Sequence, residues 1–98
     1  MESAWGVMPV DDVFAISSSA CVVTGKISNG YFSVGDSVKI IHKDGSIIKS
    51  SVSEIEKTMR KIDQVQAGDN ASLMFRGVNK RNVQPGDMIR NIGATQKI

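Results

Sequence analysis

Residues 40–48 read Ile40-Ile41-His42-Lys43-Asp44-Gly45-Ser46-Ile47-Ile48. Two pairs of isoleucines, which favour strands, flank an Asp-Gly dipeptide. Asp-Gly can take positive φ at both central positions, as a type I′ hairpin turn requires. The stretch therefore predicts two antiparallel strands joined by a type I′ turn at Asp44-Gly45, and it sets an all-β expectation for the rest of the chain.

Further turn motifs occur on both sides of this hairpin. An apolar-x-x-Gly-Asp motif occurs three times, at residues 32–36, 65–69 and 83–87. In the last copy, Pro85 presets φ and Gly86 supplies positive φ, which predicts a type II turn. Strand-like segments follow each copy, at Val38–Ile41, Ala71–Phe75 and Met88–Ile92. Short strands between such turns are typical of a sandwich or a small barrel.

Two further segments, Asp12–Ser17 and Cys21–Ile27, also have strand composition. Residues 51–62 are ambiguous. Val52, Ile55, Met59 and Ile62 fall at helical spacing, and Ser51 with Glu54 forms a capping-box pattern. The pattern alone leaves helix and strand open for this segment.

Composition points to one small globular domain. The chain has 98 residues, of which 41% are hydrophobic and 22% charged, and its formal net charge is +2. This mildly basic balance permits contact with phosphates without demanding it. A single cysteine excludes an internal disulfide and suits a reducing compartment. Neither a membrane-length apolar run nor a secretory signal is present, so we expect a cytoplasmic protein.

Several stretches taken in order resemble domain two of elongation factor Tu-type translation factors. They are residues 8–16, 22–27, 30–36, 55–56, 66–70, 75–78 and 83–87. The resemblance implies an all-β fold, a small closed antiparallel barrel of about six strands, and it favours strand over helix for residues 51–62. Closure removes the exposed edges that invite aggregation. We expect the barrel at residues 8–92, between a flexible N-terminal segment at 1–7 and a tail at 93–98.

In that family, domain two holds the 3′ terminal adenosine and the aminoacyl group of charged tRNA. The matching positions are Asp11, Asp12, Phe14, Ile16, Thr24, Glu56, Asn70 and Phe75. Apolar walls would stack the unpaired base, a carboxylate would accept from a ribose hydroxyl, and an amide would meet the aminoacyl ester. From pattern alone, Phe14 and Ile16 fit core packing equally well, Glu56 fits a solvated strand face, and Asn70 fits a turn cap.

Five cations are candidates for phosphate contacts or, alternatively, for a solvated surface: Arg60, Lys61, Arg76, Lys80 and Arg81. Two departures from the family pattern stand out. Ser18-Ser19-Ala20-Cys21 replaces a Gly-Arg-Gly-Thr-like turn, and Thr58-Met59-Arg60-Lys61 replaces a Phe-Arg-Lys stretch. The first departure puts in doubt any contact that this turn makes in the family.

Catalytic chemistry is not predicted for this chain. It has no Gly-x-x-x-x-Gly-Lys-Ser/Thr phosphate loop, and Asn82 stands where a guanine-reading Asn-Lys-x-Asp motif requires Asp. His42 and Cys21 have no partners in sequence for a metal cluster or a nucleophile–base pair. We therefore expect no cofactor here, with GTP and Mg only in a longer parent, and no enzyme activity.

The expected partners are aminoacyl-tRNA or the ribosome, bound weakly by the isolated chain, and a GTPase domain if the chain is part of a larger protein. No membrane or DNA partner is expected. The alternative is a stand-alone domain-two paralogue that acts as a protein-interaction or adaptor module.

Overall fold

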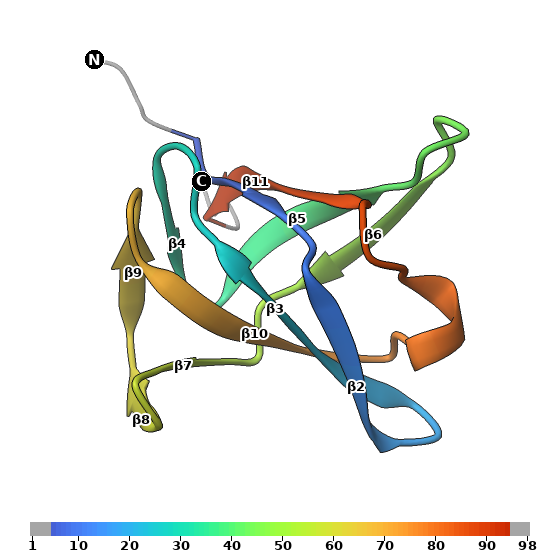
Figure 1. Ribbon diagram of the computed structural model, residues 1–98, viewed down its shortest axis with the longest axis horizontal. Coiled ribbons are helices and arrows are strands. Elements are labelled where there is room, and N and C mark those ends of the chain that lie inside the picture. Colours follow the sequence, from blue (N-terminus) through green and yellow to red (C-terminus); the bar gives the residue numbers. More distant parts are fainter. Residues whose placement is uncertain (1–4, 95–98) are drawn as a thin grey trace.

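The computed structural model describes residues 5–94, and nearly all of them lie in strands or turns (Figure 1). A single 3-10 turn, η1 (Lys80–Asn82), is the helical element in this range. The strands are β1 (Val7–Pro9), β2 (Asp12–Ser17), β3 (Ala20–Lys26), β4 (Tyr31–Ser33), β5 (Asp36–Ile41), β6 (Ile47–Ser51), β7 (Glu54–Lys57), β8 (Arg60–Ile62), β9 (Gln64–Gln66), β10 (Asn70–Arg76) and β11 (Met88–Ala94). The all-β prediction is confirmed.

The strands form three antiparallel sheets. Their orders are β1-β11-β5-β6, β2-β3-β10-β7-β8 and β4-β9. Between residues 5 and 94 the ladders do not join into one hydrogen-bonded ring, so the sheets as described are not closed. The expected count of about six strands is too low, because residues 54–66 alone contribute three short strands, β7, β8 and β9.

The strands extend slightly beyond the predicted barrel boundaries, residues 8–92. β1 begins at Val7, Trp5 bridges Tyr31, and β11 continues to Ala94. The outer parts of the two expected end segments, residues 1–4 and 95–98, lie outside the described residues.

The core lies between the sheets, and strand alternation builds it. On β3 and β10 every second residue faces inward, which buries Val23, Leu73 and Phe75 completely. Gly25 on β3 allows close approach of β1, because a Cβ there would lie 2.3 Å from the Pro9 carbonyl oxygen. Burial also raises the pKa of the Cys21 thiol. Among residues 5–94, no helix is long and apolar enough to cross a membrane.

The three Gly-Asp motifs form three copies of one turn. Gly35, Gly68 and Gly86 have φ of 94°, 95° and 96°. The aspartate that follows each glycine accepts a hydrogen bond from the backbone N–H three residues earlier, at 2.8–2.9 Å. At the third copy Asp87 N also donates to Gln84 O, as the predicted type II turn requires.

The hairpin at residues 40–48 is present, but its predicted type I′ turn is wrong. Gly45 has a φ of 91°, whereas Asp44 is not among the residues with positive φ. Gly45 N donates to His42 O, and His42 N donates to Ser46 O. The glycine therefore closes a longer loop instead of sitting at the centre of a two-residue turn. Asp44 stabilises this loop by accepting from Ser46 N at 2.9 Å and from Ser46 Oγ at 2.6 Å.

The pair with positive φ at both central positions lies elsewhere, between β7 and β8. Thr58 and Met59 have φ of 54° and 63°, and Lys57 pairs with Arg60 across them. This tight turn breaks the helical periodicity of residues 51–62. The expectation of strand for this segment is confirmed.

Candidate nucleic-acid interface

The outer face of the five-stranded sheet carries most of the predicted site. Val13 and Val23 face the core, so their strand neighbours face out. Phe14 and Ile16 are 54% and 55% exposed. The alternative that these two side chains pack in the core is therefore wrong. Because large apolar side chains seldom stand exposed side by side without a role, this part of the face is a candidate contact surface.

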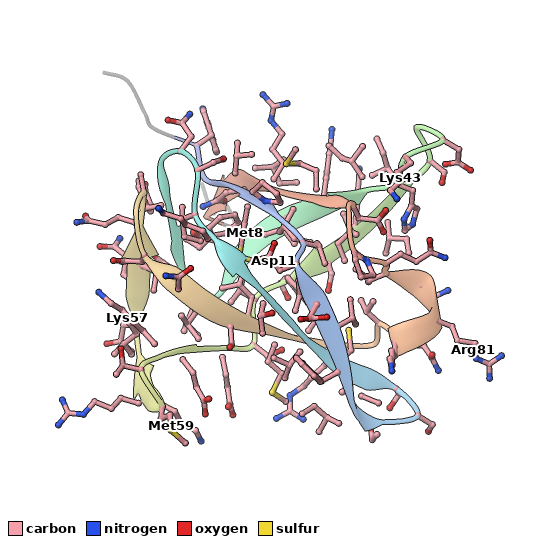
Figure 2. All side chains as sticks on the ribbon, in the orientation of Figure 1. Met8, Asp11, Lys43, Lys57, Met59 and Arg81 are labelled. Atoms are coloured by element: carbon pink, nitrogen blue, oxygen red, sulfur yellow. The ribbon has the colours of Figure 1, made fainter. Side chains whose placement is uncertain are left out.

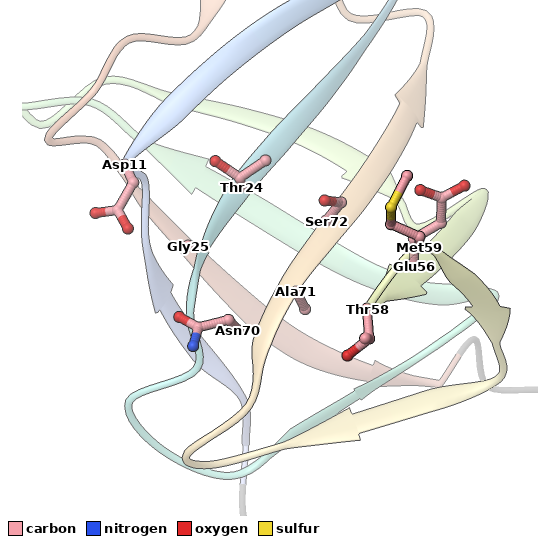
Figure 3. Close-up of a pocket in the computed structure, with 9 residues that line it drawn as sticks. All are labelled: Asp11, Thr24, Gly25, Glu56, Thr58, Met59, Asn70, Ala71 and Ser72. Carbon is pink, nitrogen blue, oxygen red and sulfur yellow. The ribbon is translucent and has the colours of Figure 1, made fainter.

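A hollow of about 290 Å³ opens on this face (Figure 3). Four of the eight predicted residues line it from four parts of the chain, and β3 pairs with β10 beneath it. Its lining residues are Asp11, Thr24, Gly25, Glu56, Thr58, Met59, Asn70, Ala71 and Ser72. The hollow combines two carboxylates, an amide and hydroxyls with two apolar side chains, Met59 and Ala71.

Five of the residues lining this hollow were not predicted as contacts: Gly25, Thr58, Met59, Ala71 and Ser72. Thr58 and Met59 form the tight turn between β7 and β8, and Met59 is 94% exposed. Positive φ is strained for a β-branched residue, and strain of this kind gathers at functional sites. The departure from the family pattern at Thr58-Met59 was the available signal. Ser72 was also missed, although alternation along β10 places it on the same face as Met74.

An ion pair fixes the edge of the hollow beside Asn70. Lys57 Nζ on β7 lies 2.9 Å from Asp69 Oδ1, in the turn that leads into β10. Asp69 Oδ2 accepts from Gln66 N at 2.9 Å. The pKa of Asp69 lies below its usual value. The hydrogen bond from Gln66 N–H is the largest cause, and the hydrogen bond from Lys57 is the next. The turn that presents Asn70 is thereby tied to the strand that presents Glu56.

A second hollow of about 170 Å³ adjoins the first and is more apolar. Glu56 and Ser72 line both. The remaining lining residues are Ile16, Val22, Glu54 and Met74. Together the two hollows give a polar half and an apolar half, linked at Glu56.

The remaining predicted residues do not join the hollows. Phe75 is fully buried, because it lies two residues from Leu73 on β10 and faces the core as Leu73 does. Its predicted contact with the ligand is therefore wrong. Asp12 lines a different hollow, near η1. Phe14 is exposed on the same sheet, paired in register with Val22.

The five candidate cations are dispersed. Arg60 and Lys61 lie on β8, Arg76 ends β10, and Lys80 and Arg81 lie in η1. Lys61 Nζ is 3.6 Å from Glu54 Oε1, an exposed pair of small energetic weight. The structure does not bring the five into one patch.

The turn at Ser18-Ser19, which lacks the glycines of the family pattern, is stabilised by hydrogen bonds from residues 77–79. Ser18-Ser19 joins β2 to β3, with a bulge between Ala15 and Ser17. Gly77 N donates to Ser19 O, and Asn79 Nδ2 donates to Ser18 O, both at 2.6 Å. Hydrogen bonds from the segment after β10 thus support this turn in place of glycine geometry.

Comparisons with known proteins agree with this architecture. Residues 21–90 match the family model described as elongation factor Tu domain 2. The apo form of translation elongation factor SelB from Methanococcus maripaludis superposes with a TM-score of 0.81 at 26% identity, over 90% of this chain and 19% of that one. The same factor in complex with the GTP analogue GppNHp gives 0.81 at 27% identity, over 94% and 20%. The chain thus spans about a fifth of the length of these neighbours.

Proposed function

This chain belongs to the elongation factor Tu domain 2 family, and on that premise we propose that its outer-face hollows bind the 3′ acceptor end of aminoacyl-tRNA. Domain 2 is a non-catalytic module of translational GTPases, so the function to be assigned is binding. One observation carries the proposal. Asp11, Thr24, Glu56 and Asn70 were singled out from separate stretches of sequence, and they line one surface hollow.

The chemistry of the lining suits the parts of an acceptor end. An unpaired terminal base needs an apolar surface and polar atoms for its edge. Ile16 and Met59 would supply the first, and Ser72 the second. Glu56, at the junction of the two hollows, would accept a hydrogen bond from a ribose hydroxyl. Asn70 would donate to the ester carbonyl, and Asp11 would face the aminoacyl ammonium group.

Affinity should be weak for the isolated chain. Phosphate contacts supply most of the affinity in RNA recognition, and the five candidate cations are dispersed. In a larger protein, we propose that a GTPase domain faces these hollows and completes the site.

The test is a titration of the chain with aminoacylated and deacylated tRNA, followed by backbone amide shifts. We expect the amides of residues 11, 24, 56 and 70 to move with the charged tRNA and to move less with the uncharged one. Glu56→Gln should weaken binding several-fold. Asp63→Asn is the matched control, because Asp63 is an exposed carboxylate away from both hollows. Shifts that spare these four residues would exclude the acceptor-end site.

A second candidate function is protein contact by the apolar part of the same face. The exposure of Phe14 and Ile16 favours it. A Phe14→Ser variant separates the two functions. Loss of a protein partner with unchanged tRNA-induced shifts at Asn70 would support the adaptor role.

A further inference from the structure

The four-stranded sheet ends at β6, and no strand among residues 5–94 pairs with the outer edge of β6. His42 N donates to Ser46 O across the β5–β6 hairpin, so these two residues form a hydrogen-bonded pair. Along an antiparallel ladder, such pairs alternate with pairs whose backbone groups point away from each other. The residues of β6 whose N–H and C=O groups point to the open edge are Ile47, Lys49 and Ser51. None of the three has a backbone partner at this edge in the described part of the chain.

The outer face of this sheet carries a row of three cations, which runs across three neighbouring strands to the open edge. The register places Arg90 beside Lys39 and Lys39 beside Lys49. Because Ile89 and Ile40, their neighbours along the strands, are fully buried, the cations face outward. Within residues 5–94, none of the three forms an ion pair. Like charges directly opposite each other destabilise a sheet, so the row favours an anionic partner.

No carboxylate among the described strands shares this face with the cations. Asp36 and Asp87 are buried and face the core. Asp44 is exposed, but it lies in the hairpin loop, beyond the paired Ile41 and Ile47. The other outward positions of the four strands hold Val7, Pro9, Ser37, Ile41, Ile47, Ser51, Met88 and Ile92. The face is therefore positive, with apolar residues beside the cations.

We propose that the open edge of β6 binds an extended acidic peptide segment of a protein partner, which adds a fifth strand to this sheet. The edge offers both donors and acceptors, and a peptide backbone supplies the complement of both. A Glu or Asp of the partner would lie beside Lys49 and extend the row of cations with a negative charge. Two residues along the partner, an apolar side chain would lie beside Ile47, which is 49% exposed. Phosphate groups accept hydrogen bonds but donate none, so a nucleic acid backbone would leave the carbonyl groups of the edge unpaired.

A second copy of the chain is a poor occupant of this edge. Two β6 strands paired about a two-fold axis near Lys49 would place the two lysines side by side, which is unfavourable. Proteins place lysines on edge strands to prevent such pairing, and Lys49 alone would fit that protective role. Lys39 and Arg90, however, lie on β5 and β11, which are interior strands of the sheet. Edge protection does not explain those two cations, whereas an acidic partner does.

The experiment uses the whole chain and the capped synthetic peptide Ser-Val-Thr-Glu-Thr-Glu-Ser, with a Gln-for-Glu peptide as its uncharged match. We expect the Glu peptide to slow hydrogen exchange at the amides of residues 47, 49 and 51. The Gln peptide should bind about fivefold more weakly, and Lys39→Gln/Lys49→Gln should weaken binding of the Glu peptide by about the same factor. The matched control is Lys26→Gln/Lys80→Gln, because these exposed lysines lie outside the four-stranded sheet.

Equal losses of affinity in the two double variants would show a general charge effect and overturn the proposal. Slower exchange at the same three amides when the chain is concentrated without peptide would show self-pairing and also overturn it. The same slowing with a single-stranded RNA in place of the peptide would assign the edge to nucleic acid instead. Lys49→Glu should reverse the preference and bind a Lys-for-Glu peptide better than the Glu peptide, which an unfolded variant cannot do.

The peptide site and the proposed acceptor-end site can be tested separately. Lys43, in the loop of the β5–β6 hairpin, and Met59, on the wall of the 290 Å³ hollow, lie on opposite sides of the molecule (Figure 2). Glu56→Gln should therefore weaken binding of charged tRNA and leave binding of the Glu peptide unchanged. Loss of peptide binding in Glu56→Gln would contradict the assignment to β6.

Discussion

His42 Nδ1 lies 2.8 Å from Asp87 Oδ2, so a side chain of the β5–β6 loop is tied to the last of the three Gly-Asp turns. The other two turns are tied in the same way by different chemistry. Asp36 Oδ2 accepts from Asn91 Nδ2 at 2.8 Å, and Asp69 Oδ1 lies 2.9 Å from Lys57 Nζ. In each turn the aspartate closes its own loop and then bonds a distant residue.

These three aspartates should differ in energetic weight because they differ in burial. Asp36 and Asp87 are 5% and 3% exposed, so replacing either by alanine removes the acceptor of buried or part-buried donors. We expect Asp36→Ala and Asp87→Ala each to lower the free energy of unfolding by about 2 kcal/mol. Asp69→Ala, at a more exposed site, should have a smaller effect. Urea denaturation measures all three, and equal losses would contradict this ranking.

The depressed pKa of Asp69 predicts a pH dependence. Its folded pKa lies below the ordinary value of about 3.9, so its contribution to stability is present above that value. The contribution is lost as pH falls through the lower, folded pKa. Asp69→Asn should therefore show a shallower decline in stability than the wild-type chain below about pH 4. Urea midpoints measured across that range provide the check, and parallel declines would refute it.

Gly25 should be intolerant of a side chain although its φ is not positive. A Cβ would lie 2.3 Å from Pro9 O and 3.1 Å from Met8 Cγ, so β1 must move. We expect Gly25→Ala to cost about 1–3 kcal/mol in unfolding free energy, as overpacking does. Gly45→Asn is the control, since nothing lies within 4 Å of a Cβ there and Asn tolerates positive φ. A cost at Gly25 no larger than at Gly45 would contradict the packing argument.

The Cys21 thiol should be unreactive in the folded chain. It is fully buried, and burial raises its pKa, so less thiolate is present than at a free cysteine of the same pH. The stability linked to the protonated thiol is present below the ordinary thiol pKa and is lost as pH rises through the raised pKa of the folded chain. At pH 8, we expect a disulfide reagent to label Cys21 only as fast as the chain opens. A cysteine at exposed position 49 should react at once, and equal rates would contradict the prediction.

Much of the fold follows from local chemistry in the sequence. The expected strand Asp12–Ser17 coincides with β2, and the three Gly-Asp motifs form the turns that they predict. Residues 51–62 could not be assigned from their own pattern. Their helical periodicity is broken by positive φ at Thr58 and Met59, which pairing with β8 imposes and which neither residue prefers.

The site was less predictable from sequence. Which alternate residues of a strand face the core depends on how the sheets pack, and the sequence does not state this. Val13 and Phe14 are both apolar, so composition does not show which of them faces the core. Phe75 could have been excluded, since Leu73 and Phe75 share a face and Ser72 lies on the other. The hollow between the β5–β6 loop and η1 joins residues almost forty positions apart, His42 and Arg81, and no local motif links them.

Replacing the Thr58–Met59 turn by a less strained one should raise the stability of the chain and weaken its binding of tRNA. Its two φ values, 54° and 63°, suit Asn and Gly better than Thr and Met. Replacing Thr58→Asn together with Met59→Gly should therefore stabilise the chain by about 1–2 kcal/mol. The same change removes an exposed side chain, Met59, from the wall of the 290 Å³ hollow, so tRNA-induced shifts at Asn70 should weaken.

The control for that pair is Lys43→Asn in the β5–β6 loop. Neither Lys43 nor Asp44 has positive φ, so Asn should bring no gain in stability there. Destabilisation of the double variant would show that the tight turn is not strained. A gain in stability with unchanged tRNA-induced shifts would show that Met59 does not contact the ligand. A gain in stability with weaker shifts is the result expected if a strained turn is kept because its side chains form the site.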